Sequence, residues 1–185
     1  MLVQFVSLKR GGEKVSMSTR SGKFVTLSDV IKEVGVDATR FFFLMRSSDT
    51  HLDFDLELAK KESPENPVFY IQYAHARICS IFQTATKQGI NLLDQVDLDL
   101  KPLENEEELI IIKKILAFTE TVEKSAELLE VHRIAFYLQD LVGTFHRYYS
   151  SNRIVSDDQT VTLARLFLMN CLRVTIRNGL SIMGV

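Results

Sequence analysis

The residues that could do chemistry in this chain fall into three lines, each repeating every three or four positions. That spacing places the members of one line on one side of an α-helix. Aromatic rings stack on unpaired bases, and arginine side chains neutralise phosphates or bond to base edges. The lines therefore predict three helix faces that bind an RNA loop, and we expect them to share one concave surface. Their residues are Tyr70, Tyr73 and Arg77, then His146, Tyr149 and Arg153, and finally Asn170, Arg173 and Arg177.

Other kinds of site are not supported by the sequence. The four histidines are dispersed, and neither Cys79 nor Cys171 has a partner at metal-binding spacing. Gly11 and Gly12 lack the spacing of a phosphate-binding loop, and no nucleophile is flanked by a base and an orienting group. His75 falls among apolar positions and is interpreted as a hydrogen-bonded core histidine. The residues alone thus predict a non-catalytic chain with no metal or cofactor of its own.

Long amphipathic helices must position these lines. Asn66 is a good N-cap, Pro67 suits the first helical position, and Gly89 can end a helix that runs to about Lys87. The apolar side of this helix is predicted to lie about 130° from the line that holds Tyr73. The members of that apolar side are Val68, Ile71, His75, Ile78, Phe82 and Ala85.

Further helices are expected towards the carboxyl end. One spans residues 132–152, and another spans residues 161–183 and is apolar almost all round. A single amphipathic helix is predicted for residues 106–130, after a connector at residues 90–105. The predicted core positions are Ile134, Leu138, Leu141, Phe145 and Tyr148 in the helix at 132–152, and Leu109, Ile112, Leu116, Thr119, Val122 and Ala126 in the helix at 106–130.

The start of the chain carries a β-hairpin signal. Two β-prone pieces, residues 2–8 and 15–27, flank the turn sequence RGGEK. Two or three strands bury too little area to be stable alone, so the hairpin must pack on the helices or on another part of the protein. Short helices are expected from Asp29 and from Asp37. The predicted fold class is mainly α, a helical bundle preceded by a short β-hairpin.

Composition and charge narrow the possible partners. The 185 residues are 46% hydrophobic, and no apolar run approaches the roughly 20 residues of a membrane span. Two cysteines and no secretory signal favour the cytoplasm. Residues 94–130 hold 11 acidic and 4 basic residues, whereas residues 131–185 hold 3 acidic and 6 basic residues. Polyanion contact is expected from the second segment and from the helix at 66–82, and the acidic run Glu104 to Glu108 is interpreted as a solvated face.

The chain resembles a known family over nearly its whole length. Four sequence segments follow one another in order between Ser18 and Arg77: STRSGKFVTL, EVGVDATRFFFLMRSSDTHLDFDLELAKK, ENPVFY and YAHARI. They resemble the carboxy-terminal half of arginyl-tRNA synthetases. The resemblance implies that residues 1–27 end a catalytic domain, that residues 28–62 are connecting helices, and that residues 63–185 are an α-helical anticodon-binding domain.

The resemblance also implies roles for the three lines. In this family the segment similar to NPVFYIQYAHARI stacks on anticodon bases and bonds to them, which implicates the line of Tyr73. The word FHRYYSSNRI implicates the line of Tyr149 in the same way. In the last helix the family's D-A-L-R word is here NCLR, from Asn170 to Arg173, so only its last two letters survive. Arg173 can still contact the tRNA, and Arg177 is expected on a phosphate.

The loop VSMSTRSG resembles the K-M-S-K-S signature that folds over ATP phosphates in class I synthetases. Met17 and Ser18 match, Ser16 and Thr19 replace the two lysines, and Arg20 offers a cation nearby. Without the resemblance the loop would be interpreted as a plain surface turn. The H-I-G-H signature occurs nowhere in the sequence, so the chain alone is expected to be inactive. The parent enzyme implied by the resemblance ligates arginine to its tRNA with ATP and magnesium.

The partners implied by the resemblance are the tRNA for arginine and the upstream catalytic domain of the same protein. DNA and membranes are not expected as partners, and the parent is expected to be monomeric. Two alternatives remain open. The exposed tyrosines and arginines would also suit a helical protein-interaction module without RNA binding. A small complete enzyme using the loop at residues 16–22 would be revealed by ATP–pyrophosphate exchange.

Overall fold

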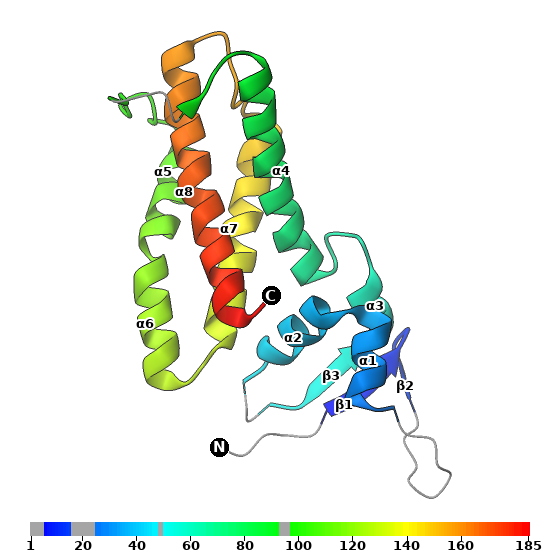
Figure 1. Ribbon diagram of the computed structural model, residues 1–185. Coiled ribbons are helices and arrows are strands. Elements are labelled where there is room, and N and C mark those ends of the chain that lie inside the picture. Colours follow the sequence, from blue (N-terminus) through cyan, green and yellow to red (C-terminus); the bar gives the residue numbers. More distant parts are fainter. Residues whose placement is uncertain (1–5, 16–24, 48–49, 93–96) are drawn as a thin grey trace, which may run out of the picture.

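The structure of the protein is a computed structural model that describes residues 6–15, 25–47, 50–92 and 97–185. Long helices form one bundle, and a small sheet with short helices lies beside its lower end in Figure 1. The mainly helical prediction is confirmed. The predicted signature loop at residues 16–20 lies outside the described residues. No helix in the described ranges combines the length and apolar character needed to cross a bilayer.

In the described ranges the bundle is built from five helices, and the first of them starts as predicted. The side chain of Asn66 caps it by accepting the N–H of Phe69 at 3.5 Å. The Asn66 amide also donates to the carbonyl oxygens of Ala59 and Lys61, at 3.0 and 2.9 Å, which ties this helix to the preceding segment. The five helices are α4 (Pro67–Lys87), α5 (Glu106–Leu116), α6 (Phe118–Leu128), α7 (His132–Ser151) and α8 (Gln159–Met183).

The core of the bundle surrounds α7, which packs on α4, α5, α6 and α8. All five positions predicted for its core are buried, so that prediction is confirmed. The buried side of α4 is nearly as predicted, but Ala74 and Ile81 are enclosed there while His75 and Phe82 are only half-buried. The enclosed side of α4 therefore extends towards Tyr70, which brings the tyrosine line of α4 against α7.

The single helix predicted for residues 106–130 is wrong in two respects. The chain ends α5 and begins α6 at Ala117, and no glycine or proline marks the break. Leu109 and Leu116, expected in the core, are 43% and 74% exposed, and Thr119 and Ala126, also expected there, are exposed as well. Glu108 is buried instead, so the acidic run is not wholly solvated. Glu108 points inward because Arg165 of α8 provides a cationic partner for it.

The predicted hairpin is confirmed in its first strand and its turn. β1 (Val6–Arg10) pairs with β2 (Glu13–Lys14) in antiparallel fashion. Gly11 and Gly12 form the turn with φ of 60° and 88°, a conformation that favours glycine in tight hairpins. β2 has only two residues and ends before the second β-prone piece begins, and most of that piece lies outside the described residues.

A third strand was not predicted. β3 (Leu52–Asp55) lies parallel to β1, on the opposite side from β2. Leu52 and Phe54 are buried and Asp53 is exposed, which is the alternation of a half-buried strand. The segment predicted as connecting helices thus contains this strand among its helices. Those helices are α1 (Leu27–Val34), α2 (Val36–Leu44), which packs on α4, α7 and α8, and α3 (Leu56–Lys60).

Candidate nucleic-acid interface

Arg77 of α4 is held between two aromatic rings. Its guanidinium carbon lies 4.6 Å from the centroid of the Tyr73 ring on the same helix and 4.8 Å from that of Tyr149 on α7. Its Nη2 donates to the Tyr73 hydroxyl at 2.7 Å, and its Nη1 donates to Nδ1 of His146 at 3.2 Å. The first two predicted lines therefore meet around one cation, which cation–π attraction helps to hold in place.

Two further rings pack beneath this arrangement. The ring centroids of Tyr70 and His146 are 4.4 Å apart, and His146 stacks on Tyr73 at 6.0 Å. Tyr73 and Tyr149 are 44% and 37% exposed, whereas Tyr70 and His146 are half-buried. Tyr73 and Tyr149 can thus offer ring surface to a ligand while the other two support them. We call Tyr70, Tyr73, Arg77, His146 and Tyr149 the α4–α7 cluster.

Phe69 extends the α4–α7 cluster and was missed in the sequence. Its ring stacks on that of Tyr73, with centroids 5.9 Å apart and ring planes 7° apart. The two residues are four positions apart on α4, a spacing at which helical side chains meet. That spacing is the sequence signal for Phe69, which the line through Tyr70, Tyr73 and Arg77 does not include.

A cleft of about 400 Å³ continues from the α4–α7 cluster past the carboxyl end of α7. Tyr149 belongs to both the cluster and the cleft, and Arg153 lies on the cleft wall beside it. The volume falls within the roughly 300 to 1,000 Å³ of small-ligand pockets. The aromatic and polar residues that line the cleft are Ser80, Thr84, Gln88, Tyr149, Asn152 and Arg153.

The third predicted line lies on another surface. Figure 1 shows α4 beside both α7 and α8. The guanidinium carbon of Arg173 on α8 lies 4.9 Å from the ring centroid of Phe82, and Arg173 donates to Oδ1 of Asn170 at 2.8 Å. Helical geometry places Phe82 on roughly the opposite flank of α4 from Arg77. The expectation of one shared concave surface is therefore wrong for this line, because α7 and α8 pack on different flanks of α4 and their lines contact those separate flanks.

His75 lies at the edge of the buried side of α4 rather than fully inside it. Burial lowers its pKa, and the charges of Arg173 and Arg177 lower it further. Its Nδ1 is 3.9 Å from Sγ of Cys79. Within the described part of the chain, no group of three or more histidine, cysteine, aspartate or glutamate side chains is placed to hold a metal ion.

Protonation of His146 is expected to destabilise the fold, because Arg77 bonds to the lone pair of its Nδ1. Burial lowers the pKa of His146 below the ordinary 6.5 and the charge of Arg77 lowers it further, which the backbone of Tyr70 partly offsets. The unfolded chain then takes up this proton more readily than the folded chain. The free energy of unfolding should therefore be retained above about pH 6.5 and fall as the pH drops through and below that value.

Urea unfolding at about pH 7.5 and about pH 5.5 tests this expectation. The loss of stability between the two pH values should be smaller in His146→Gln than in the unaltered chain, since glutamine can still accept from Arg77 but does not titrate. His75, whose pKa is also lowered, is expected to account for part of the remaining loss. The same loss in both proteins would show that His146 does not contribute.

Comparisons with known proteins bear on this surface. A family model described as the DALR anticodon binding domain matches residues 71–185. The chain is 54% identical over 185 residues to the arginine–tRNA ligase of Syntrophotalea carbinolica, covering all of this chain and 33% of that protein. The chain thus spans about a third of the length of the curated relatives that it matches.

Solved structures agree in fold. A crystal structure from Campylobacter jejuni, provisionally assigned as an arginyl-tRNA synthetase, matches with a TM-score of 0.85 and 34% identity, over 100% of this chain and 39% of that chain. The arginyl-tRNA synthetase of Thermus thermophilus matches with a TM-score of 0.72 and 21% identity, over 96% and 33% of the two chains. At that identity the second likeness concerns the fold alone.

Proposed function

The chain belongs to the DALR anticodon-binding domain family, and on that premise we propose that it binds the anticodon stem-loop of a tRNA for arginine. The relatives that it matches along its whole length are arginine–tRNA ligases. We assign the ligation itself, with its ATP and magnesium, to the part of such a protein that lies outside the match. That catalytic part would be the protein partner of this chain, within a monomeric enzyme. The free thiols of Cys79 and Cys171 fit the reducing cytoplasm as its location.

The observation that carries the proposal is the position of Arg77 between the rings of Tyr73 and Tyr149. An unstacked base can lie on either exposed ring, and base–aromatic stacking stabilises such complexes by about 1 to 3 kcal/mol per base. A guanidinium has five N–H donors, and two of those of Arg77 are engaged by Tyr73 and His146. Among the described residues the other donors have no partner, so they can bond to a base edge or a phosphate without moving the side chain, and the site is arranged before the RNA arrives.

The remaining arginines suit the phosphate backbone. Arg153 lies beside Tyr149 on the cleft wall, so it can neutralise a phosphate next to a base stacked on that ring. Arg173 and Arg177 lie on the α8 flank of α4 and would contact a different stretch of backbone from the one at the α4–α7 cluster. We propose that the stem-loop lies across α4, with its open bases on the α7 side.

Binding of a fluorescently labelled anticodon stem-loop, followed by anisotropy, tests this function. We expect specific binding that weakens with salt, with a log–log slope near −2 for about three phosphate contacts to a largely single-stranded loop. Arginine tRNA should displace the label and a random single strand of the same length should not. A salt-insensitive affinity would contradict the phosphate contacts. Failure to bind the stem-loop would favour the alternative, a helical module that binds proteins through the same rings.

A further inference from the structure

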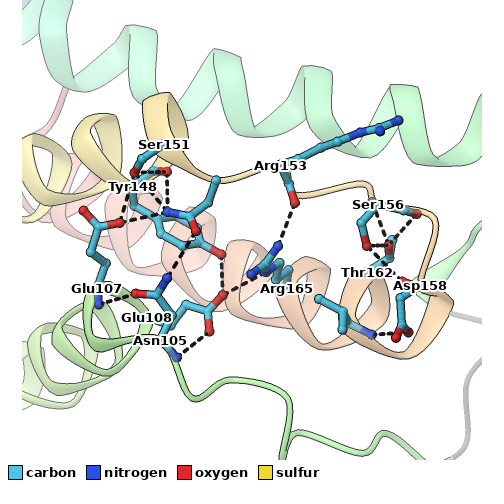
Figure 2. Close-up of polar contacts among 12 residues, drawn as sticks. Asn105, Glu107, Glu108, Tyr148, Ser151, Arg153, Ser156, Asp158, Thr162 and Arg165 are labelled. Carbon is cyan, nitrogen blue, oxygen red and sulfur yellow. Dashed lines mark hydrogen bonds and ion pairs between the residues drawn. The ribbon is translucent and has the colours of Figure 1, made fainter.

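A carboxylate is buried where α5, α7 and α8 meet. Glu108 has no exposed side-chain area, although it belongs to the first turn of α5. Its Oε1 accepts from the Tyr148 hydroxyl at 2.7 Å and from Nε of Arg165 at 2.8 Å. Its Oε2 accepts the backbone N–H of Asn105 at 3.2 Å. Figure 2 shows these contacts converging on the one carboxylate, which is therefore satisfied by α7, by α8 and by the residue that caps its own helix.

Arg165 extends this network to the rim of the cleft. Its Nη1 donates to the backbone carbonyl oxygen of Arg153 at 2.8 Å. Arg153 follows the end of α7 at Ser151, and the residue before it is extended, with φ of −125° and ψ of 130°. The Arg153 carbonyl therefore lies outside the helical hydrogen-bond ladder. In Figure 2 the side chain of Arg153 points away from the network while its carbonyl points towards Arg165.

The residues on either side of Arg153 are also held in place, by hydrogen bonds or by burial. The Asn152 side chain donates to Glu107 at 2.8 Å and accepts from Asn105 at 3.2 Å, so the start of α5 clamps the end of α7. Ile154 and Val155 are buried beneath the cleft. Contacts on both sides of Arg153 thus restrain the neighbouring residues, and Arg165 supplies the contact at Arg153 itself.

We propose that Arg165, held by Glu108, is a positioning residue that fixes the backbone of Arg153 so that its side chain reaches a nucleotide phosphate beside Tyr149. The inference rests on the proposed function. Arg165 is not among the residues that line the cleft and its side chain is only 18% exposed, so we expect it to act on RNA in the cleft through Arg153. A guanidinium can bond to the carboxylate and to the carbonyl at once because its donors are fixed in one plane, which a lysine ammonium cannot reproduce.

The replacement Arg165→Lys tests the proposal, since it keeps a positive charge beside Glu108 but removes the planar guanidinium with its fixed set of donors. Affinity for the anticodon stem-loop should fall by about 3- to 10-fold, the effect of one misplaced contact. In the Arg153→Gln background the same replacement should cause no further loss, because the side chain that it positions is already absent. Equal losses in both backgrounds would overturn the proposal, since they would indicate a general structural effect.

Hydrogen exchange in the RNA-free chain provides a second, independent measurement. Arg165→Lys should increase exchange of the backbone amides of residues 153–156 and leave those in the middle of α7 unchanged. Arg133→Lys is the matched control, because Arg133 pairs with Glu130 on the surface at the far end of α7. Unchanged exchange at residues 153–156 would overturn the positioning. If the unaltered chain fails to bind the stem-loop, the proposed function falls, and the exchange alone decides whether Arg165 positions Arg153.

Discussion

Replacing Glu108 with alanine is expected to lower the free energy of unfolding by about 3 to 5 kcal/mol. The carboxylate is fully buried, and its removal leaves Nε of Arg165 and the hydroxyl of Tyr148 without their acceptor. Burial and the bond to Glu108 raise the pKa of Tyr148, so this hydroxyl stays protonated and needs an acceptor. Urea unfolding followed by circular dichroism measures the loss.

Two controls separate this network from ordinary surface contacts. Glu107→Ala removes the neighbouring carboxylate, which bonds to Asn152 from a partly exposed position, and should cost only about 0.5 to 1.5 kcal/mol. The combination Glu108→Leu, Tyr148→Phe and Arg165→Met replaces the whole network with apolar groups and should recover much of the lost stability. A loss below about 1 kcal/mol in Glu108→Ala would mean that water or another group takes over the role of the carboxylate.

The buried position of Glu108 could not be predicted from the sequence. An acidic residue in the first turn of a helix is favoured by the helix dipole at the surface, and this local pattern predicted a solvated face. Its two side-chain partners lie 40 and 57 positions further along the chain. The strand β3 was missed for the same reason, since it is four residues long and pairs with β1 across a wide gap in sequence.

Local sequence signals were sufficient where an element is determined by the residue types within it. The cap at Asn66 and the core side of α7 follow from residue types within a single helix, and both are found as predicted. The pairing of Tyr73 with Arg77 is likewise a contact between positions four apart. The approach of Tyr149 to Arg77 and the separation of Arg173 from Arg77 depend on how α4, α7 and α8 are rotated against one another. Helical spacing within one helix does not define that rotation.

Replacing Arg77 with alanine is expected to weaken binding of the anticodon stem-loop by about 30- to 100-fold, which corresponds to about 2 to 3 kcal/mol. The change removes the only cation shared by the rings of Tyr73 and Tyr149 in the described contacts, together with the donors that it presents. It also removes the hydrogen bond to Tyr73 and the cation–π contact to Tyr149 that help to hold the two rings, so a base would have to complete their ordering on binding. Anisotropy titrations of the labelled stem-loop measure the affinity, and circular dichroism confirms that the variant is folded.

The matched variants Arg77→Lys and Arg173→Ala show whether charge or geometry is responsible. Lysine keeps the charge but lacks the planar fork, so it should recover only part of the affinity and leave a loss near 10-fold. Arg173→Ala removes a cation from the opposite flank of α4 and should reduce affinity by about 3- to 5-fold, with a shallower salt dependence. If Arg77→Ala binds within about 3-fold of the unaltered chain, or if lysine restores full affinity, then net charge rather than the ring-bound guanidinium selects the RNA.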